Sequence, residues 1–159
     1  MSRLQALTIQ QPYAHLIVCP QDHLPDGVVR KEVENRTTRH SFRGEFAIHA
    51  GKSFDWFEHG DWPGVWKVTH ASQVPEMAFG AIVAVADVIT CLSLDQIVRL
   101  KDYKTEVGEI LSRSRKHVCG PFVLVLGNVR KLLKPVACTG AQGWWYVPME
   151  VEAAVRRQL

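Results

Sequence analysis

The sequence predicts an α+β protein, a small mixed β-barrel with peripheral helices. Its 159 residues are about one domain's worth. The composition, with 47% hydrophobic and 22% charged residues, is that of a globular chain that can bury a core. Several well-separated apolar segments of strand type have helical segments between them, without the regular alternation of a parallel βαβ fold. No repeat or linker divides the chain, so we expect a single domain over residues 1–159.

The first third of the chain is expected to form a strand, a helix and two more strands. Leu4–Ile9 is the first strand. Pro12 suits the first position of the helix that follows, because its missing N–H costs nothing there, and Pro20 cannot continue that helix. Val33–Arg36 and Arg43–His49 are extended segments, and the second of them alternates apolar and other residues.

The middle of the chain contains a tryptophan-rich segment, a buried strand and two helical segments. Gly51–Gln73 holds three of the five tryptophans and is expected to be a helical turn and a loop that cover an edge of the core. Phe79–Thr90 is apolar on both faces, apart from one aspartate, which indicates a strand covered on both sides. Ser93–Gln96 has the pattern of a capping box that starts a short helix. Lys101–Lys116 is expected to be a helix followed by a basic surface segment.

The last part of the chain is expected to add two strands and a terminal helix. Pro121–Val129 is a strand, and the basic stretch Arg130–Lys134 follows it. Trp144–Val147 is the last strand and ends at Pro148, and Glu150–Leu159 is a helix.

Composition and motifs exclude several classes of protein. The net charge of +3 and the pI near 8.7 are compatible with nucleic-acid binding but do not identify it. The four cysteines are widely spaced, without a C-x-x-C pair, so we expect free thiols and neither a metal nor a cofactor site. No P-loop, G-x-G-x-x-G, G-x-S-x-G or H-E-x-x-H pattern occurs. The longest apolar run is far shorter than the ~20 residues that cross a bilayer, and no secretory signal is visible, so we expect a cytoplasmic protein without a membrane segment.

The most informative stretch is Lys31-Glu32-Val33-Glu34-Asn35-Arg36. In an extended segment alternate side chains share a face, which places Glu34 and Arg36 together. A turn at the start of the segment would bring Lys31 round to join them. Such a group could bind a phosphate or the edge of a base, with the lysine as a point charge and the arginine as a planar fork. From spacing alone, an exposed ladder of ion pairs without a function is the simpler interpretation.

The sequence also resembles the ASCH domain family, a branch of the PUA-like β-barrels. The family hallmark is G-x-K-x-x-E-x-R, and Lys31, Glu34 and Arg36 have the matching spacing, with Val29 in the glycine position. Four further segments resemble the family in the same order along the chain, from residue 4 to about 148: Leu7–Ala14, Arg43–Ala50, Gly80–Asp87 and Pro135–Pro148.

The resemblance implies a PUA-like barrel that binds RNA or a nucleotide in a cleft beside the strands. Lys31 and Arg36 would contact phosphate or base, and Glu34 would accept a hydrogen bond from a base amine. Aromatic side chains would stack on bases. The ligand-binding residues expected on this basis are Gln11, Tyr13, Lys31, Glu34, Arg36, His49 and Trp144.

An alternative function implied by the resemblance is hydrolysis of RNA or of a modified nucleoside of the N4-acetylcytidine type. Lys31 would then be the general base or electrostatic stabiliser and Glu34 a proton shuttle, with His49 as an assistant. In the amidohydrolase branch a catalytic threonine stands where this chain has Glu34, and a later glutamate completes the site; Glu106 and Glu109 lie in the corresponding region. A third possibility is a protein-interaction domain that docks through its basic segments.

Overall fold

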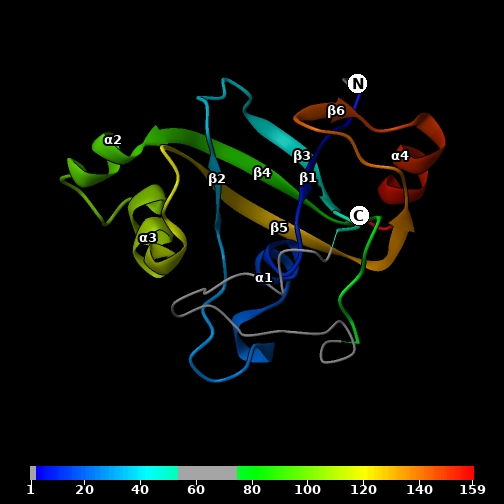
Figure 1. The fold of residues 1–159 in the computed structure, drawn as a ribbon, viewed down its shortest axis with the longest axis horizontal. Helices are drawn as coiled ribbons and strands as arrows, with labels where there is room; N and C mark the ends of the chain where they lie inside the picture. The colour runs from blue at the N-terminus through cyan, green and yellow to red at the C-terminus, as the bar shows by residue number, and fades with distance from the viewer. Residues whose placement is uncertain (1–2, 54–74) are drawn as a thin grey trace.

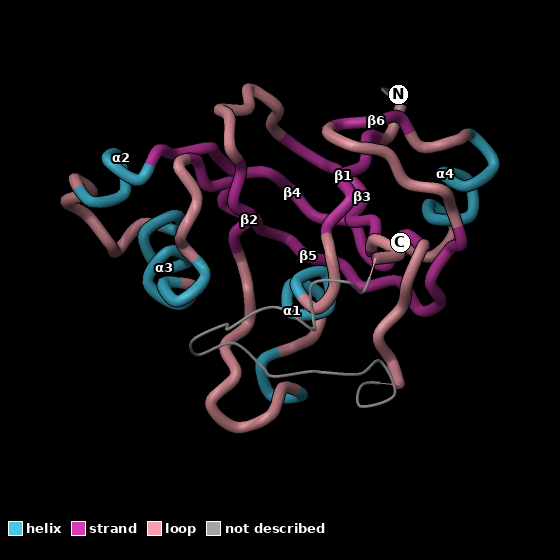
Figure 2. Tube along the Cα trace, in the orientation of Figure 1, coloured by secondary structure: helices cyan, strands magenta, loops and turns pink. Residues whose placement is uncertain are grey.

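Six strands form one mixed sheet that curls into a half-barrel (Figures 1 and 2). The structure is a computed structural model, and it describes residues 3–53 and 75–159. The strands are β1 (Gln5–Ile9), β2 (Val33–Arg36), β3 (Gly44–Ala50), β4 (Ala81–Ser93), β5 (Phe122–Ala137) and β6 (Trp144–Tyr146). Their order across the sheet is β2-β5-β4-β3-β1-β6. The pair β1–β3 is parallel, and the other neighbours are antiparallel. The expected α+β class is confirmed.

In residues 3–53 and 75–159, four helices and two 3₁₀ turns surround the sheet. The helices are α1 (Tyr13–Val18), α2 (Leu94–Val98), α3 (Glu106–Arg113) and α4 (Met149–Arg156), and the turns are η1 (Gln21–His23) and η3 (Arg115–His117). Figure 1 shows α2 and α3 at one end of the long β4–β5 ribbon and α4 at the other end. No helix in residues 3–53 and 75–159 is long and apolar enough to span a membrane.

The two faces of the sheet are both buried. On one face, Phe46 and Ile48 of β3 pack in the same cluster as Ile17 of α1. On the other face, Ala47 packs in a cluster with Val155 of α4, because neighbouring residues of a strand point to opposite sides. The strand β4 contributes to both clusters. The interpretation of this segment as a strand covered on both sides is therefore confirmed.

Two expected boundaries differ from the structure. Pro12 is the N-cap residue of α1 rather than its first helical residue, and the Gln11–Pro12 peptide bond is cis. The basic stretch Arg130–Lys134 does not follow the strand but belongs to β5, which continues to Ala137. It stays in the ladder because it pairs with the first half of β4 past a bulge and because the apolar Leu132 is buried in the cluster below α4. The tryptophans expected to cover a core edge, at 56, 62 and 66, lie outside the described residues.

The start of α2 is confirmed in detail. The Ser93 side chain accepts a hydrogen bond from the Gln96 N–H, and the Gln96 side chain accepts one from the Ser93 N–H. This reciprocal arrangement satisfies two of the N–H groups that a helix leaves unpaired at its start.

We predict that Ser93→Ala lowers the free energy of unfolding by about 1 kcal/mol, the usual cost of losing a capping side chain. Ser112→Ala, which removes an exposed hydroxyl within α3, is the control and should leave stability within about 0.5 kcal/mol of the parent. Urea denaturation followed by circular dichroism measures both. Equal stabilities for the two variants would contradict the capping role.

Candidate functional site

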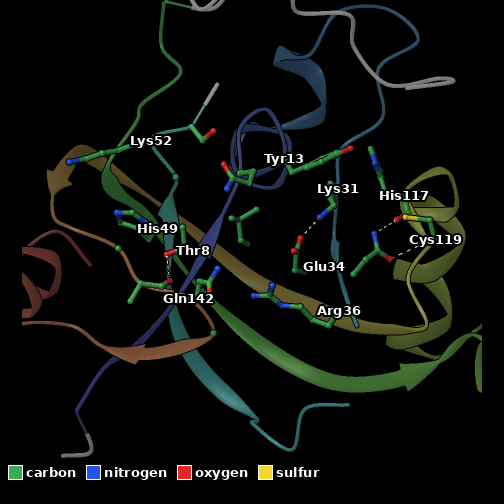
Figure 3. A pocket seen from close by; sticks show the side chains of 18 of the residues that line it. Thr8, Tyr13, Lys31, Glu34, Arg36, His49, Lys52, His117, Cys119 and Gln142 are labelled. Atoms are coloured by element: carbon green, nitrogen blue, oxygen red, sulfur yellow. Dashed lines mark hydrogen bonds and ion pairs between the residues drawn. The ribbon is translucent and has the colours of Figure 1, made fainter. Parts of the chain in front are cut away.

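A cavity of about 990 Å³ opens between the two edges of the curled sheet (Figure 3). The edge strand β2 contributes one wall, and the segment that leads into the other edge strand, β6, contributes the opposite wall. The ends of β1 and β3 form the floor between them. The described residues that line it include four cations and one carboxylate: Lys31, Arg36, Lys52, Lys116 and Glu34. The volume lies at the upper end of the ~300–1,000 Å³ typical of small-molecule sites.

Main-chain hydrogen bonds hold Lys31 in place just before β2 begins. The Lys31 N–H donates to the carbonyl of Leu16 at 3.0 Å, which ties the segment to α1. The next N–H, that of Glu32, donates to the Ser114 hydroxyl at 2.8 Å, after the end of α3. The expected turn of Lys31 toward Glu34 is therefore produced by contacts to two helical segments far away in the sequence.

Lys31 and Glu34 form a hydrogen-bonded ion pair inside the cavity wall. The Lys31 side chain is 3% exposed and that of Glu34 is 12% exposed, so the pair is shielded from water. The interpretation of this motif as an exposed ladder of ion pairs is thus wrong for these two residues. The ammonium also lies 5.0 Å from the centre of the Tyr13 ring, a cation–π distance. Burial, with the nearby Cys119 and Glu34, raises the pKa of the Tyr13 hydroxyl, which therefore stays protonated at neutral pH.

Arg36 lies in the same cavity without a counterion among the described residues. Its Nε is buried and makes no hydrogen bond to the part of the chain that the structure describes. Within residues 3–53 and 75–159, no carboxylate forms an ion pair with its guanidinium. An unpaired buried donor on a charged group is costly unless something else satisfies it. Arg36 is therefore a cation of the cavity whose charge no described carboxylate neutralises.

Asn35 attaches the neighbouring turn to β2. Its Nδ2 donates to the carbonyl of His117 at 2.8 Å, and its Oδ1 accepts from the N–H groups of Cys119 and Gly120 at 3.0 and 2.9 Å. A side chain on Gly120 would lie 2.7 Å from the Asn35 Cβ, so the close approach requires glycine. The Asn35 amide thereby fixes the wall of the cavity that contains Cys119 and His117 (Figure 3).

Two buried histidines border the cavity with the same hydrogen-bonding pattern. The Nε2 of His49 lies 2.9 Å from the carbonyl of Cys138, and the Nε2 of His117 lies 2.7 Å from that of Val29. Since a carbonyl only accepts, each Nε2 carries the proton. Each Nδ1 is buried and has no partner among the described residues. Burial lowers the pKa of both imidazoles, so both are neutral at pH 7 and offer an acceptor at Nδ1.

The structure brings together five of the seven expected ligand-binding residues. Tyr13, Lys31, Glu34, Arg36 and His49 all line the cavity.

Gln11 and Trp144 are not part of its lining. The Gln11 side chain is 1% exposed and bridges the N–H of His15 and the carbonyl of Ala78. The Trp144 ring stacks on Phe42 and packs against the core below α1. For these two residues a role in binding stays a prediction without support from the geometry.

Several lining residues carry no signal that single-sequence reasoning could use. Lys52, Lys116 and the loop of residues 139–143 join the cavity only because the sheet curls. Glu106 and Glu109, the candidates for a second catalytic carboxylate, lie on α3 and are not among the lining residues, where Glu34 is the only carboxylate of the described part. Within that part, no cluster of three or more His, Cys, Asp or Glu side chains could hold a metal ion.

The lowered histidine pKa values predict that stability falls as the pH falls. Below the ordinary pKa of 6.5, an unfolded chain binds protons that the buried imidazoles of His49 and His117 do not, so acid favours unfolding. Stability should therefore be highest above about pH 6.5 and should decline toward pH 5. His117→Gln, which keeps a donor for the Val29 carbonyl, should show a smaller decline than the parent in urea denaturation at several pH values. An equal or steeper decline would contradict the assignment.

Comparison with known proteins identifies the fold. No protein-family model and no curated protein sequence matches the chain. Among solved structures, the ASCH protein of Zymomonas mobilis covers 98% of this chain and 94% of its own, with a TM-score of 0.50 and 9% identity. A tyrosine-to-phenylalanine variant of that protein gives the same TM-score and identity and covers 98% of both chains. At this identity the likeness concerns the backbone arrangement alone. The expected relationship is thus confirmed at the level of architecture: the chain has the ASCH fold.

Proposed function

We propose that this protein binds a nucleotide, either free or as an unstacked residue of single-stranded RNA, in the cavity between β2 and the β6 edge. The observation that carries the proposal is the position of Arg36. Its guanidinium lies in a cavity of ligand size, with a buried Nε that no described residue satisfies. A phosphate or the acceptor edge of a base would pair with this guanidinium, whose planar fork suits both.

The charges around Arg36 favour an anion. Glu34 is paired with Lys31, so those two charges compensate each other. The remaining cations of the lining, Arg36, Lys52 and Lys116, have no carboxylate opposite them among the described lining residues. A concave site with an excess of one sign of charge concentrates ligands of the opposite sign.

The remaining groups suit a nucleobase. Lys31 occupies Oε2 of Glu34, which leaves Oε1 as an acceptor for an exocyclic amine. Tyr13 provides an aromatic ring at the wall, and bases stack on such rings with little regard to sequence. Cationic and aromatic groups together are what proteins use to bind unpaired nucleotides.

Substitution of Arg36 tests the proposal. We expect Arg36→Ala to weaken binding of a short single-stranded RNA by about tenfold or more, the usual loss when a charged hydrogen bond is removed. The slope of log K against log salt should fall by about one. Arg99→Ala removes the same charge from an exposed pair outside the cavity and should bind as the parent does. Filter binding over a salt series, with single nucleotides as competitors, distinguishes RNA from free nucleotide. If the parent protein binds none of these probes at low salt, the proposal is refuted.

Hydrolysis is a second candidate, favoured by the buried Lys31–Glu34 pair inside the cavity. A lysine in an ion pair stabilises negative charge better than it accepts a proton, so Glu34 would be the base that activates water. A hydroxyl nucleophile at that position is not available, because residue 34 is a glutamate. We expect Glu34→Gln to abolish any release of acetate from N4-acetylcytidine, or any cleavage of RNA; because the variant leaves Lys31 unpaired, circular dichroism has to show that it still folds. Lack of turnover of both substrates by the parent protein would contradict a hydrolytic role.

A further inference from the structure

We propose that one end of the cavity, formed by Thr8, His49, Lys52 and the loop of residues 139–143, holds the sugar-phosphate part of the ligand, while the base lies toward Tyr13 and Glu34. We call it the Lys52 end. The inference rests on the proposed function and adds an orientation for the ligand. It predicts that a nucleotide binds more tightly than the corresponding nucleoside. Figure 3 shows Thr8, His49, Lys52 and Gln142 on one side of Arg36, and Tyr13, His117 and Cys119 on the other.

The side chain of Lys52 is held in place by a glycine. Gly80 has a φ of +61°, and a Cβ at this position would lie 2.6 Å from Cε and 2.9 Å from Cγ of Lys52. The lysine stem therefore lies directly on the Gly80 backbone, in space that any other residue would fill. This contact reduces the entropy that an exposed lysine would otherwise lose on binding an anion.

The loop of residues 139–143 contains main-chain N–H groups that make no hydrogen bond within the described structure. The N–H groups of residues 139–142 donate no hydrogen bond to another described residue. All five residues line the cavity. Consecutive main-chain N–H groups in a glycine-containing loop are a common way of binding phosphate oxygens.

His49 and Thr8 lie directly under this loop. A Cβ on Gly140 would lie 2.5 Å from Nδ1 of His49 and 2.7 Å from Oγ1 of Thr8, so the loop can approach only because residue 140 is glycine. His49 is 2% exposed, and its Nδ1 is an acceptor without a partner in the described structure. The ring thereby supports the loop from below, and the loop itself forms the surface at this end of the cavity.

Charge separates the two ends. The only carboxylate among the described lining residues, Glu34, lies with Lys31 and Tyr13 rather than at the Lys52 end. An anionic group at the base end would meet that carboxylate together with the cations Lys31 and Lys116, whereas at the Lys52 end it meets a lysine and main-chain N–H groups with no carboxylate among the described lining residues. An exocyclic amine has the opposite preference.

Binding of matched nucleosides and nucleotides tests the orientation. The four ribonucleosides and their 5′-monophosphates are titrated by calorimetry into the parent protein, Lys52→Ala, Gly80→Ala and Lys101→Ala. Lys101 is exposed and outside the cavity, so its variant controls for the lost charge. We expect the phosphate to strengthen binding to the parent by about tenfold.

The Lys52→Ala variant should lose most of this increase in affinity without a change in its affinity for nucleosides. Gly80→Ala should lose it too, because its methyl group displaces the lysine stem, and circular dichroism confirms that this variant folds.

The possible outcomes separate the two proposals. The orientation is wrong if Lys52→Ala still binds the nucleotide more tightly than the nucleoside. It is also wrong if the parent binds nucleosides and nucleotides equally well. Either result leaves the proposed function intact. Failure of nucleosides, nucleotides and a short RNA alike to bind the parent overturns both. Loss of the gain in Lys52→Ala but not in Lys101→Ala supports the assignment, and the short RNA shows whether the phosphate comes from a free nucleotide or a chain.

Discussion

The buried ion pair between Lys31 and Glu34 constrains the rest of the site. Removing two charges from water costs about as much as their attraction returns, so such a pair adds little net stability. Loss of one partner, however, leaves an uncompensated charge inside the protein and typically costs about 3–5 kcal/mol. Glu34 is the one carboxylate of the described lining, and because it is paired with Lys31, Arg36 has no counterion among the described residues. The local pairing of two residues thereby determines the charge that the cavity presents to a ligand.

The topology of the sheet explains why a cavity exists at this place. A sheet with the order β2-β5-β4-β3-β1-β6 has two edges, and in a closed barrel these would pair with each other. Here the sheet curls only halfway, so β2 and the loop before β6 face each other across a gap lined by polar side chains. Unpaired edges are usually a liability for a sheet. In this fold the edges form the walls of the cavity, and α1 and α4 bury the two faces.

The sequence was informative where one short segment decides the outcome. Alternation along Val33–Arg36 placed Glu34 and Arg36 on a common face, and the Ser93 capping pattern located α2. It was uninformative where distant segments meet. The approach of Lys31 depends on the carbonyl of Leu16, and Lys52 reaches the cavity only through the curl of the sheet. Trp144 was expected to stack on a base because it is aromatic and near the motif, but packing against Phe42 occupies its ring. Composition cannot distinguish these two uses of a tryptophan.

The proposed binding depends on Arg36 as the unpaired charge that meets an anionic ligand. The Arg36 Nε–Hε resonance, assigned by its absence from Arg36→Lys, reports on this group directly in ¹H–¹⁵N spectra. When the protein is titrated with a ribonucleoside monophosphate, we expect this signal to shift and to saturate with the same Kd that calorimetry gives. Binding that leaves the Arg36 signal unchanged would show that the ligand does not use the guanidinium and would contradict the proposed role of Arg36.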